Sequence, residues 1–228
     1  MRKVWALAFL LILLLPGCGE IATRGDGSRI LAMGDSLLAW HGTTGHSISD
    51  RLETYLGEPV TDRSVVGARM IYNLPITGAM GMSIPRQYRP GAWDWVVLNG
   101  GGNDLWMGCG CRACADRMER IISENGQAGE IPHLVRRIRD AGSRVIFVGY
   151  LRSPGFGSPI EHCRNEGAIF DKRLARMAAA DPGIVFLSLS DLVPSGDKSF
   201  HAFDRIHPSR KGSAAIAERI ARVIRAAN

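Results

Sequence analysis

The stretch Ile30-Leu31-Ala32-Met33-Gly34-Asp35-Ser36-Leu37 decides how this chain folds. Its first four residues form an apolar run of the length of one buried strand, and Gly34 ends that run abruptly. A strand that stops at Gly-Asp-Ser places the Ser36 hydroxyl at the carboxyl edge of a sheet, where open α/β sheets build their sites. Other polar residues that follow strands are therefore expected to meet Ser36 at the same edge.

Strand and helix patterns alternate along the rest of the chain. Trp95–Leu98 and Val145–Val148 are continuous hydrophobic runs, as buried parallel strands require, and the C-terminal segment has the periodicity of an amphipathic helix. Such alternation predicts an α/β fold, a three-layer α/β/α sandwich with about five parallel strands. The strands are expected at Ile30–Met33, Pro59–Val65, Trp93–Asn99, Arg144–Tyr150 and Ile184–Leu189, and the helices at Ser49–Leu56, Ile131–Ala141, Glu161–Ala180 and Pro208–Ala227.

Polar blocks follow the first three predicted strands, and one more lies near the C-terminus. A serine hydroxyl is a poor nucleophile until a base takes its proton, and His207 can do so while Asp204 holds its imidazole in the needed tautomer. The backbone N–H of Gly67 and the side-chain amide of Asn103 can stabilise the oxyanion that forms on an attacked carbonyl. Each block alone is ordinary turn chemistry, but their ordered co-occurrence indicates ester hydrolysis.

These blocks resemble the SGNH hydrolases, also called the GDSL esterase/lipase family, from about residue 29 to the C-terminus. The resemblance implies a flavodoxin-like fold with Ser36 as nucleophile and first oxyanion donor. It implies Gly67 and Asn103 as the other oxyanion donors, and Asp204 and His207 as the rest of a triad that uses no metal and no cofactor. The absence of a G-x-S-x-G motif argues against the α/β-hydrolase fold.

Two positions depart from the family pattern, which often has a small residue where Arg205 stands and a flexible one where Ser209 follows Pro208. The remaining histidines lack the triad spacing and are expected at the surface or in turns: His41, His46, His133, His162 and His201.

Two long stretches, Ile71–Pro90 and Leu105–Glu130, are predicted to be irregular. Each follows a predicted oxyanion donor, so both are expected to hang over the catalytic edge. Aromatic and neighbouring residues near the serine and Asn103 either wall an acyl pocket or are local packing: Trp40, His41, Trp106 and Met107.

The resemblance permits several substrates, namely short-chain carboxylesters, acetylated sugars, lysophospholipids and acyl-thioesters, so the partner is a small-molecule, lipid or acylated-glycan ester. One rival is an O-acetyl or O-acyl transferase acting on envelope glycans. The other is a catalytically silent lipoprotein that binds a glycan or a protein partner.

Residues 1–18 are predicted to be a leader outside the folded domain. Arg2 and Lys3 precede an apolar run, residues 4–15, that is shorter than the roughly 20 residues a membrane-spanning helix needs, which indicates a secretory signal peptide. Its end, Leu15–Cys18, resembles a bacterial lipoprotein box with Cys18 as the lipidated residue, and plain signal cleavage is the alternative. We then expect a tether at 19–28, one hydrolase domain at 29–228, and a periplasm-facing, outer-membrane-anchored protein of the bacterial cell envelope.

The formal net charge of +6 includes two charges in the leader. No basic stretch interleaves aromatic residues, so nucleic-acid binding is not expected. Contact with an anionic lipid surface is a secondary expectation.

Four cysteines remain beyond Cys18: Cys109, Cys111, Cys114 and Cys163. An even number in an exported protein predicts disulfides, for which three connectivities exist, with at least one bond reaching Cys163. A metal site or free thiols are the alternatives, although the spacing fits poorly the paired C-x-x-C of four-thiolate zinc sites.

Overall fold

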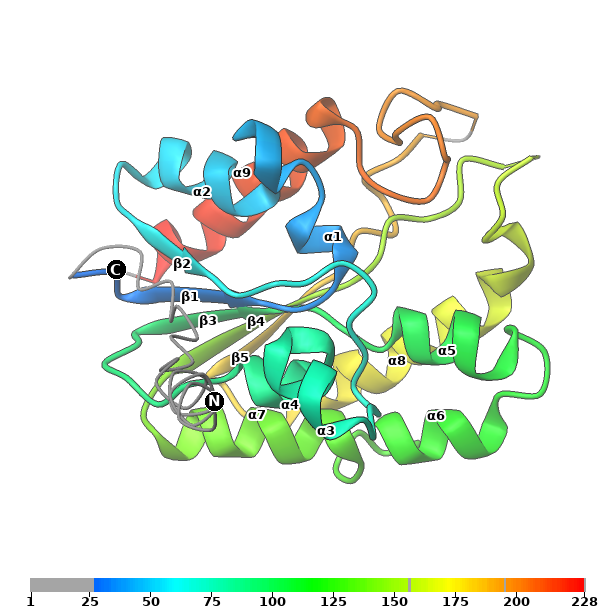
Figure 1. Cartoon of the computed structure of the whole chain (residues 1–228), viewed down its shortest axis with the longest axis horizontal. Coiled ribbons are helices and arrows are strands. Elements are labelled where there is room, and N and C mark those ends of the chain that lie inside the picture. Colours follow the sequence, from blue (N-terminus) through cyan, green and yellow to red (C-terminus); the bar gives the residue numbers. More distant parts are fainter. Residues whose placement is uncertain (1–26, 156, 195, 228) are drawn as a thin grey trace, which may run out of the picture.

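The computed structural model describes residues 27–155, 157–194 and 196–227 (Figure 1). The predictions for the leader 1–18, for Cys18 and for the tether up to residue 26 lie outside these ranges. Within the described ranges, no helix combines the length and the apolar character that crossing a membrane demands.

A single sheet of five parallel strands forms the centre of the molecule, in the order β2-β1-β3-β4-β5. This confirms the predicted α/β class. The strands are β1 Ile30–Met33, β2 Val60–Asp62, β3 Trp95–Leu98, β4 Arg144–Val148 and β5 Ile184–Leu187. β2 is shorter than predicted because the Asp62 side chain accepts hydrogen bonds from the backbone N–H and hydroxyl of Ser64, which turns the chain away from the sheet.

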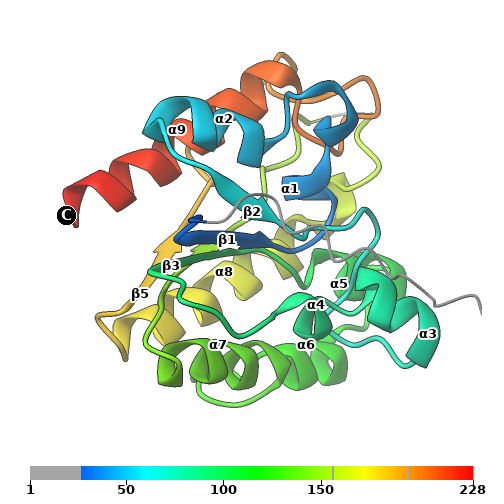
Figure 2. The same cartoon turned by 60° about the vertical axis from the view of Figure 1, so that its left-hand side comes forward.

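Helices cover both faces of this sheet, as Figures 1 and 2 show. One face carries α1 Ser36–Ala39, α2 Ile48–Leu56 and α9 Arg210–Ala226. The opposite face carries α4 Ile84–Gln87, α5 Gly102–Cys109, α6 Ala115–Ile121, α7 Glu130–Asp140 and α8 Arg164–Ala179. Shorter segments are η1 Gly42–Thr44, α3 Pro75–Thr77, η2 Gly78–Met82 and η3 Glu161–Cys163.

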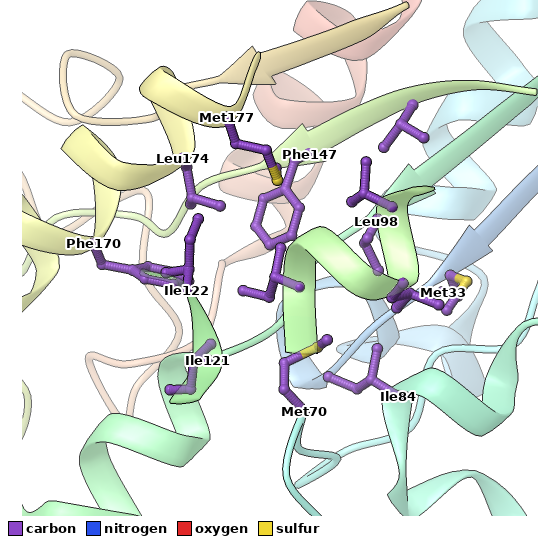
Figure 3. Close-up of a cluster of buried hydrophobic side chains, with 14 of the residues drawn as sticks. Met33, Met70, Ile84, Leu98, Ile121, Ile122, Phe147, Phe170, Leu174 and Met177 are labelled. Carbon is purple, nitrogen blue, oxygen red and sulfur yellow. The ribbon is translucent and has the colours of Figure 1, made fainter. Parts of the chain in front are cut away.

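Side chains alternate between the two faces along each strand, which divides the core into two clusters. In the cluster of Figure 3, Phe147 from β4 lies against Phe170, Leu174 and Met177 from α8. The Phe147 and Phe170 rings meet edge to face with centroids 6.5 Å apart. Fully burying a side chain of this size contributes about 1.5–3 kcal/mol, so this cluster holds α8 firmly under the carboxyl edge.

The two stretches predicted to be irregular contain short helices. Ile71–Pro90 holds α3, η2 and α4, and Leu105–Glu130 holds most of α5 and all of α6. The sequence did not predict these helices, because a helix of three to eight residues has too few turns to show a helical periodicity of apolar residues. Prolines at the first turns of α3 and α4 start these helices locally.

β1 lies between β2 and β3, so the chain leaves the sheet in opposite directions after β1 and after β3. The carboxyl ends of β1 and β3 therefore border the topological switch point, where open α/β sheets bind ligands. Ser36 follows β1 and Asn103 follows β3, which places both at this crevice.

Candidate active site

Three side chains predicted from the sequence form one hydrogen-bonded chain. His207 Nε2 lies 2.9 Å from Ser36 Oγ, and His207 Nδ1 lies 2.6 Å from Asp204 Oδ2. Ser36 and His207 are separated by 171 residues in sequence, so only the tertiary fold brings them together. The arrangement has the geometry of a nucleophile, a base and an orienting acid.

The turn after β1 aims the serine. Asp35 caps α1 because its Oδ1 accepts the Leu37 N–H at 2.9 Å, and Ser36 is the first residue of that helix. At Gly34 a Cβ would come within 2.7 Å of the Asn99 carbonyl oxygen, so only glycine fits. The buried Gln87 side chain binds the Gly34 backbone through Oε1 at 2.7 Å and Nε2 at 2.9 Å. Sequence reasoning missed Gln87, which carries no catalytic motif.

The acid and base share one tight loop. Asp204 Oδ1 accepts the backbone N–H groups of Ile206 and His207, each at 3.0 Å. Burial opposes ionisation of Asp204, but the hydrogen bonds from the His207 ring and from the two amides outweigh it and lower the Asp204 pKa. Asp204 is therefore the ionised partner of the imidazole at neutral pH.

The two departures from the family pattern each have a structural account. Arg205 adopts a left-handed φ of 58°, a conformation that small or flexible residues enter more easily. The Ser158 hydroxyl donates to the Arg205 carbonyl at 2.8 Å and holds this turn. Ser209 caps α9, since its hydroxyl accepts the Gly212 N–H at 3.1 Å.

Trp40 stacks on the catalytic base. The rings of Trp40 and His207 are nearly parallel, at 7°, with centroids 3.7 Å apart. Trp40 also caps α1, because its backbone N–H donates to the Ser36 carbonyl. The side chain thus orients the imidazole from the helix that carries the serine, rather than walling the pocket. The next residue, His41, has its Nε2 3.2 Å from the Pro208 carbonyl oxygen.

A hydrogen bond to Ala68, the residue after Gly67, links two of the predicted oxyanion donors, Gly67 and Asn103. Asn103 Nδ2 donates to the Ala68 carbonyl at 3.0 Å, which leaves the second N–H of this amide for a substrate. Gly67 has a φ of 80°, and a Cβ there would lie 3.6 Å from Met82 Cε. Glycine is therefore favoured at position 67 by its backbone conformation.

A buried hydrogen-bond relay lies beneath the serine. Tyr150 donates its hydroxyl to Asp35 Oδ2 at 2.5 Å and accepts the Gly102 N–H at 2.9 Å. Burial raises the Asp35 pKa to about 6, although the bonds from Tyr150 and Leu37 favour its charged form. Burial and the neighbouring Asp35 raise the pKa of Tyr150 well above its usual range. The sequence offered no signal for Tyr150, which joins the ends of β1, β3 and β4.

A cavity of about 490 Å³ opens beside the serine, between the ends of β3 and β4 and the start of α8. Ser36, Asn103 and His207 line it, whereas Gly67 does not. Of the four residues considered as walls, Trp106 lines this cavity and Trp40, His41 and Met107 do not. Its apolar lining includes Leu105, Leu151, Ile160, Ala168, Phe170 and Val193, and its charged lining comprises Asp35, Arg152, Arg164 and Glu166.

One of two disulfides lines this cavity, through Cys111 and Cys163. Cys109 bonds to Cys114, and Cys111 bonds to Cys163 across 52 residues. The disulfide prediction is thus confirmed, including the link to Cys163. His162 lies near Cys111 and Cys163, but a disulfide leaves these two sulfurs without the thiolate that zinc requires.

Comparison with known proteins agrees with this geometry. The model of the GDSL-like lipase/acylhydrolase family matches residues 32–215, so the chain belongs to that family and is a hydrolase of ester bonds. No curated protein matches the chain significantly.

Solved structures share the fold. A candidate acylhydrolase from Bacteroides fragilis NCTC 9343 is 18% identical with a TM-score of 0.63, covering 91% of this chain and 92% of that one. A GDSL-like lipase from Bacteroides thetaiotaomicron VPI-5482 is 17% identical with a TM-score of 0.61, covering 88% and 89%. A carbohydrate esterase family 2 enzyme from Corynascus thermopiles (Myceliophthora fergusii) is 16% identical with a TM-score of 0.59, covering 89% and 67%.

Proposed function

We propose that the protein is an exported serine esterase that cleaves carboxylic esters through an acyl-enzyme intermediate. The observation that carries the proposal is the continuous Ser36–His207–Asp204 hydrogen-bonded chain at the mouth of an apolar cavity.

The geometry supports the following steps. His207 Nε2 takes the proton of Ser36 Oγ as the oxygen attacks the ester carbonyl, and Asp204 stabilises the imidazolium that forms. The Asn103 amide and the backbone N–H groups of Ser36 and Gly67 stabilise the oxyanion. His207 then protonates the leaving alcohol. It next takes a proton from a water molecule whose oxygen attacks the acyl carbon, and it gives that proton to Ser36 Oγ as the bond to the acid breaks.

The cavity supports an acyl group of more than a few carbons. Its volume of about 490 Å³ lies within the range of small-ligand pockets, roughly 300–1,000 Å³, and its lining is mainly apolar. The acyl chain would enter beside Trp106 and Phe170, while Arg152 and Glu166 offer polar contacts. The substrate proposed is therefore a lipid-like or acylated-glycan ester.

Labelling with a fluorophosphonate tests the enzyme class. Wild-type protein should gain one label on Ser36, and Ser36→Ala should gain none. A wild-type protein that stays unlabelled while an ester panel is also untouched would favour the catalytically silent lipoprotein instead. The panel should contain p-nitrophenyl esters of increasing length, acetylated xylan and lysophosphatidylcholine.

Acyl transfer to envelope glycans is the second candidate. The same acyl-enzyme serves both reactions, and they differ in whether water or a sugar hydroxyl takes the acyl group. Single-turnover reactions with and without a soluble glycan acceptor separate them. Faster loss of the acyl-enzyme with acceptor, together with acylated glycan in the product, would favour the transferase.

The proposed location is the periplasmic side of a bacterial outer membrane, with Cys18 lipidated and residues 19–28 as the tether. The support is sequence alone, the basic Arg2-Lys3 pair, the apolar run and Leu15–Cys18. Mass spectrometry of the mature N-terminus tests it. A diacylated Cys18 is expected, and Cys18→Ser should be released from membranes. A free N-terminus at another residue would refute lipidation.

A further inference from the structure

Large apolar side chains are exposed on one side of the oxyanion donors. Leu74, Ile76 and Met80 on and beside α3 and η2 are 62%, 76% and 72% exposed. Val66 and Met107 are 51% and 45% exposed. We call these five residues the apolar patch. Exposed apolar groups gathered in this way mark an interaction site, whereas scattered ones need no explanation.

Contacts made by neighbouring residues join the segments that carry the patch. Val65, next to Val66, lies so close to Gly81 in η2 that a Cβ at Gly81 would be 2.6 Å from its Cγ2. Met107 Sδ lies 3.5 Å from the Arg69 guanidinium, which brings α5 to the same segment. Figure 2 shows α3 at the outer edge of the molecule, close to α5.

The segment that carries the patch is held in shape from its inner side. The Tyr72 hydroxyl lies 2.8 Å from Thr77 Oγ1, and Arg86 Nη1 donates to the Pro75 carbonyl at 3.0 Å. Gly78 is buried against the Arg86 and Tyr72 side chains. Leu74, Ile76 and Met80 are therefore presented outward by a bonded scaffold.

The segment that carries most of the patch has charges of one sign. Between Asp62 and Asp94 the chain has four arginines and no acidic residue. Two of these, Arg86 and Arg89, are exposed and form no ion pair with any described residue. Elsewhere arginines do pair, as in Arg139–Asp181 at 2.8 Å. Of the two less exposed arginines, Arg69 is compensated in part by the buried Asp104.

Outward apolar side chains combined with unpaired arginines fit the headgroup region of an anionic bilayer. Such a surface takes apolar side chains into the acyl boundary and attracts basic residues electrostatically. A protein partner recognised by its opposite charge would not require the five exposed apolar side chains of the patch.

We propose that the apolar patch, with Arg86 and Arg89, docks the protein on the surface of an anionic phospholipid bilayer. Val66 precedes the oxyanion donor Gly67, and Met107 lies one turn beyond Asn103 on α5. Docking therefore turns the oxyanion side of the catalytic edge toward the lipid. This inference goes beyond the proposed ester hydrolysis and does not depend on lipidation of Cys18.

Hydrogen exchange of the full chain in the Ser36→Ala background locates the contact, because that variant leaves the lipid intact. Vesicles of phosphatidylcholine with about 30 mol% phosphatidylglycerol have an anionic surface. They should slow the hydrogen exchange of residues 71–82. Exchange of α8, residues 164–179, should be unchanged, and vesicles of phosphatidylcholine alone should protect neither segment. Equal protection by both vesicles, or none in 71–82 on bound protein, would overturn the proposal.

Matched variants measure the contributions. Ile76→Ser combined with Met80→Ser should weaken binding to anionic vesicles by about tenfold or more. Ile169→Ser, at a 46% exposed apolar residue of α8, is the control and should bind as wild type. Arg89→Gln should weaken binding about fivefold at low salt, with the difference vanishing at high salt. Residues 1–26 are the same in every variant, so these differences isolate the patch.

A soluble acetyl ester separates this inference from the proposed function. All four substitutions should leave its hydrolysis unchanged, since none lies in the site. Unchanged vesicle binding by the Ile76/Met80 double variant would refute docking even if the esterase is active. Protection of 71–82 that rises with protein concentration in the absence of vesicles would assign the patch to a second copy instead.

Discussion

Two regions flank Ser36, and they are held by different forces. The triad side consists of α1 and the loop 201–209, where the N-cap at Asp35 and the Asp204 turn are local and the Trp40 stack joins the two segments. The cavity side consists of residues 102–114 and 150–168, which depend on the long-range Cys111–Cys163 link and on Tyr150. Local turns therefore set the shape of each segment that carries a triad residue, while the shape of the cavity depends on contacts far apart in sequence.

Removing the nucleophile is the largest expected effect. Ser36→Ala should lower ester turnover by about 10³-fold or more, since the remaining groups provide only ~10³–10⁴ over water. The melting temperature should change little, because His207 is the only hydrogen-bond partner of this hydroxyl among the described residues. Initial rates with p-nitrophenyl acetate and a thermal melt measure both.

Ser153→Ala is the control, since Ser153 lines the cavity outside the triad. It should keep the wild-type rate within a few-fold. A Ser36→Ala protein that retained more than about a tenth of the wild-type activity would contradict the assignment of Ser36 as the nucleophile.

Breaking the long-range disulfide tests the cavity side. Cys111→Ala with Cys163→Ala opens a loop of 52 residues and should destabilise by up to about 4 kcal/mol on the chain-entropy model. KM should rise for bulky esters and stay nearly constant for acetyl esters, because the triad contains no sulfur. Denaturant unfolding and a chain-length series of esters measure the two effects.

The matched pair Cys109→Ala with Cys114→Ala opens a loop of only 5 residues and should cost about 2 kcal/mol. If breaking Cys111–Cys163 slowed acetyl and long-chain esters equally, the two regions would not be separable.

Asp35 joins the two regions and gives stability a pH dependence. Its folded pKa of about 6 is above the unfolded value of 3.8, so the folded state binds more protons between these values. Its contribution to stability is therefore complete below about pH 4 and is lost as pH rises through 6. The loss amounts to about 3 kcal/mol, since one pKa unit is worth about 1.4 kcal/mol.

Asp35→Asn should remove this loss, so its stability relative to wild type should rise between pH 4 and pH 7. Urea unfolding at several pH values measures the difference. Asp140→Asn, at an exposed carboxyl at the end of α7, is the control. If the difference in free energy of unfolding between wild type and Asp35→Asn did not vary with pH, the Asp35 carboxyl would have the same pKa in the folded and unfolded states.

The Trp40 stack should give the smallest effect. Trp40→Leu removes an aromatic pair worth about 0.5–1.5 kcal/mol and should lower kcat two- to tenfold. KM should be unchanged because Trp40 does not line the cavity. Trp40→Phe should restore most of kcat, since it keeps a ring over His207. A rise in KM in Trp40→Leu, or a kcat in Trp40→Phe that does not recover, would show that Trp40 does not act by orienting His207.

The strands and the long helices could be predicted because their patterns repeat within a short window. β1 was predicted to the residue, and α7, α8 and α9 were placed within a few residues of their ends. The short helices α3 to α6 could not be predicted, because they are set by the proline starts of α3 and α4, by the glycine end of α5 and by packing on the sheet.

The positions of Ser36, Asn103, Asp204 and His207 were visible in the sequence because each stands in a short motif near the end of an element. Their convergence, and the roles of Gln87 and Tyr150, were not visible. Those two bind Gly34, Asp35 and Gly102 across 53, 115 and 48 residues, and no local spacing records such contacts.

The sequence by itself determined the α/β class, the four catalytic blocks and the presence of disulfides, since these follow from periodicity, order and cysteine number. Only the tertiary structure decided which cysteines pair, that Trp40 stacks on His207 instead of walling the cavity, and that Leu74, Ile76 and Met80 face outward. Each of these depends on which distant segments meet around the sheet. Burial and pairing are properties of that assembly and not of any one stretch of the chain.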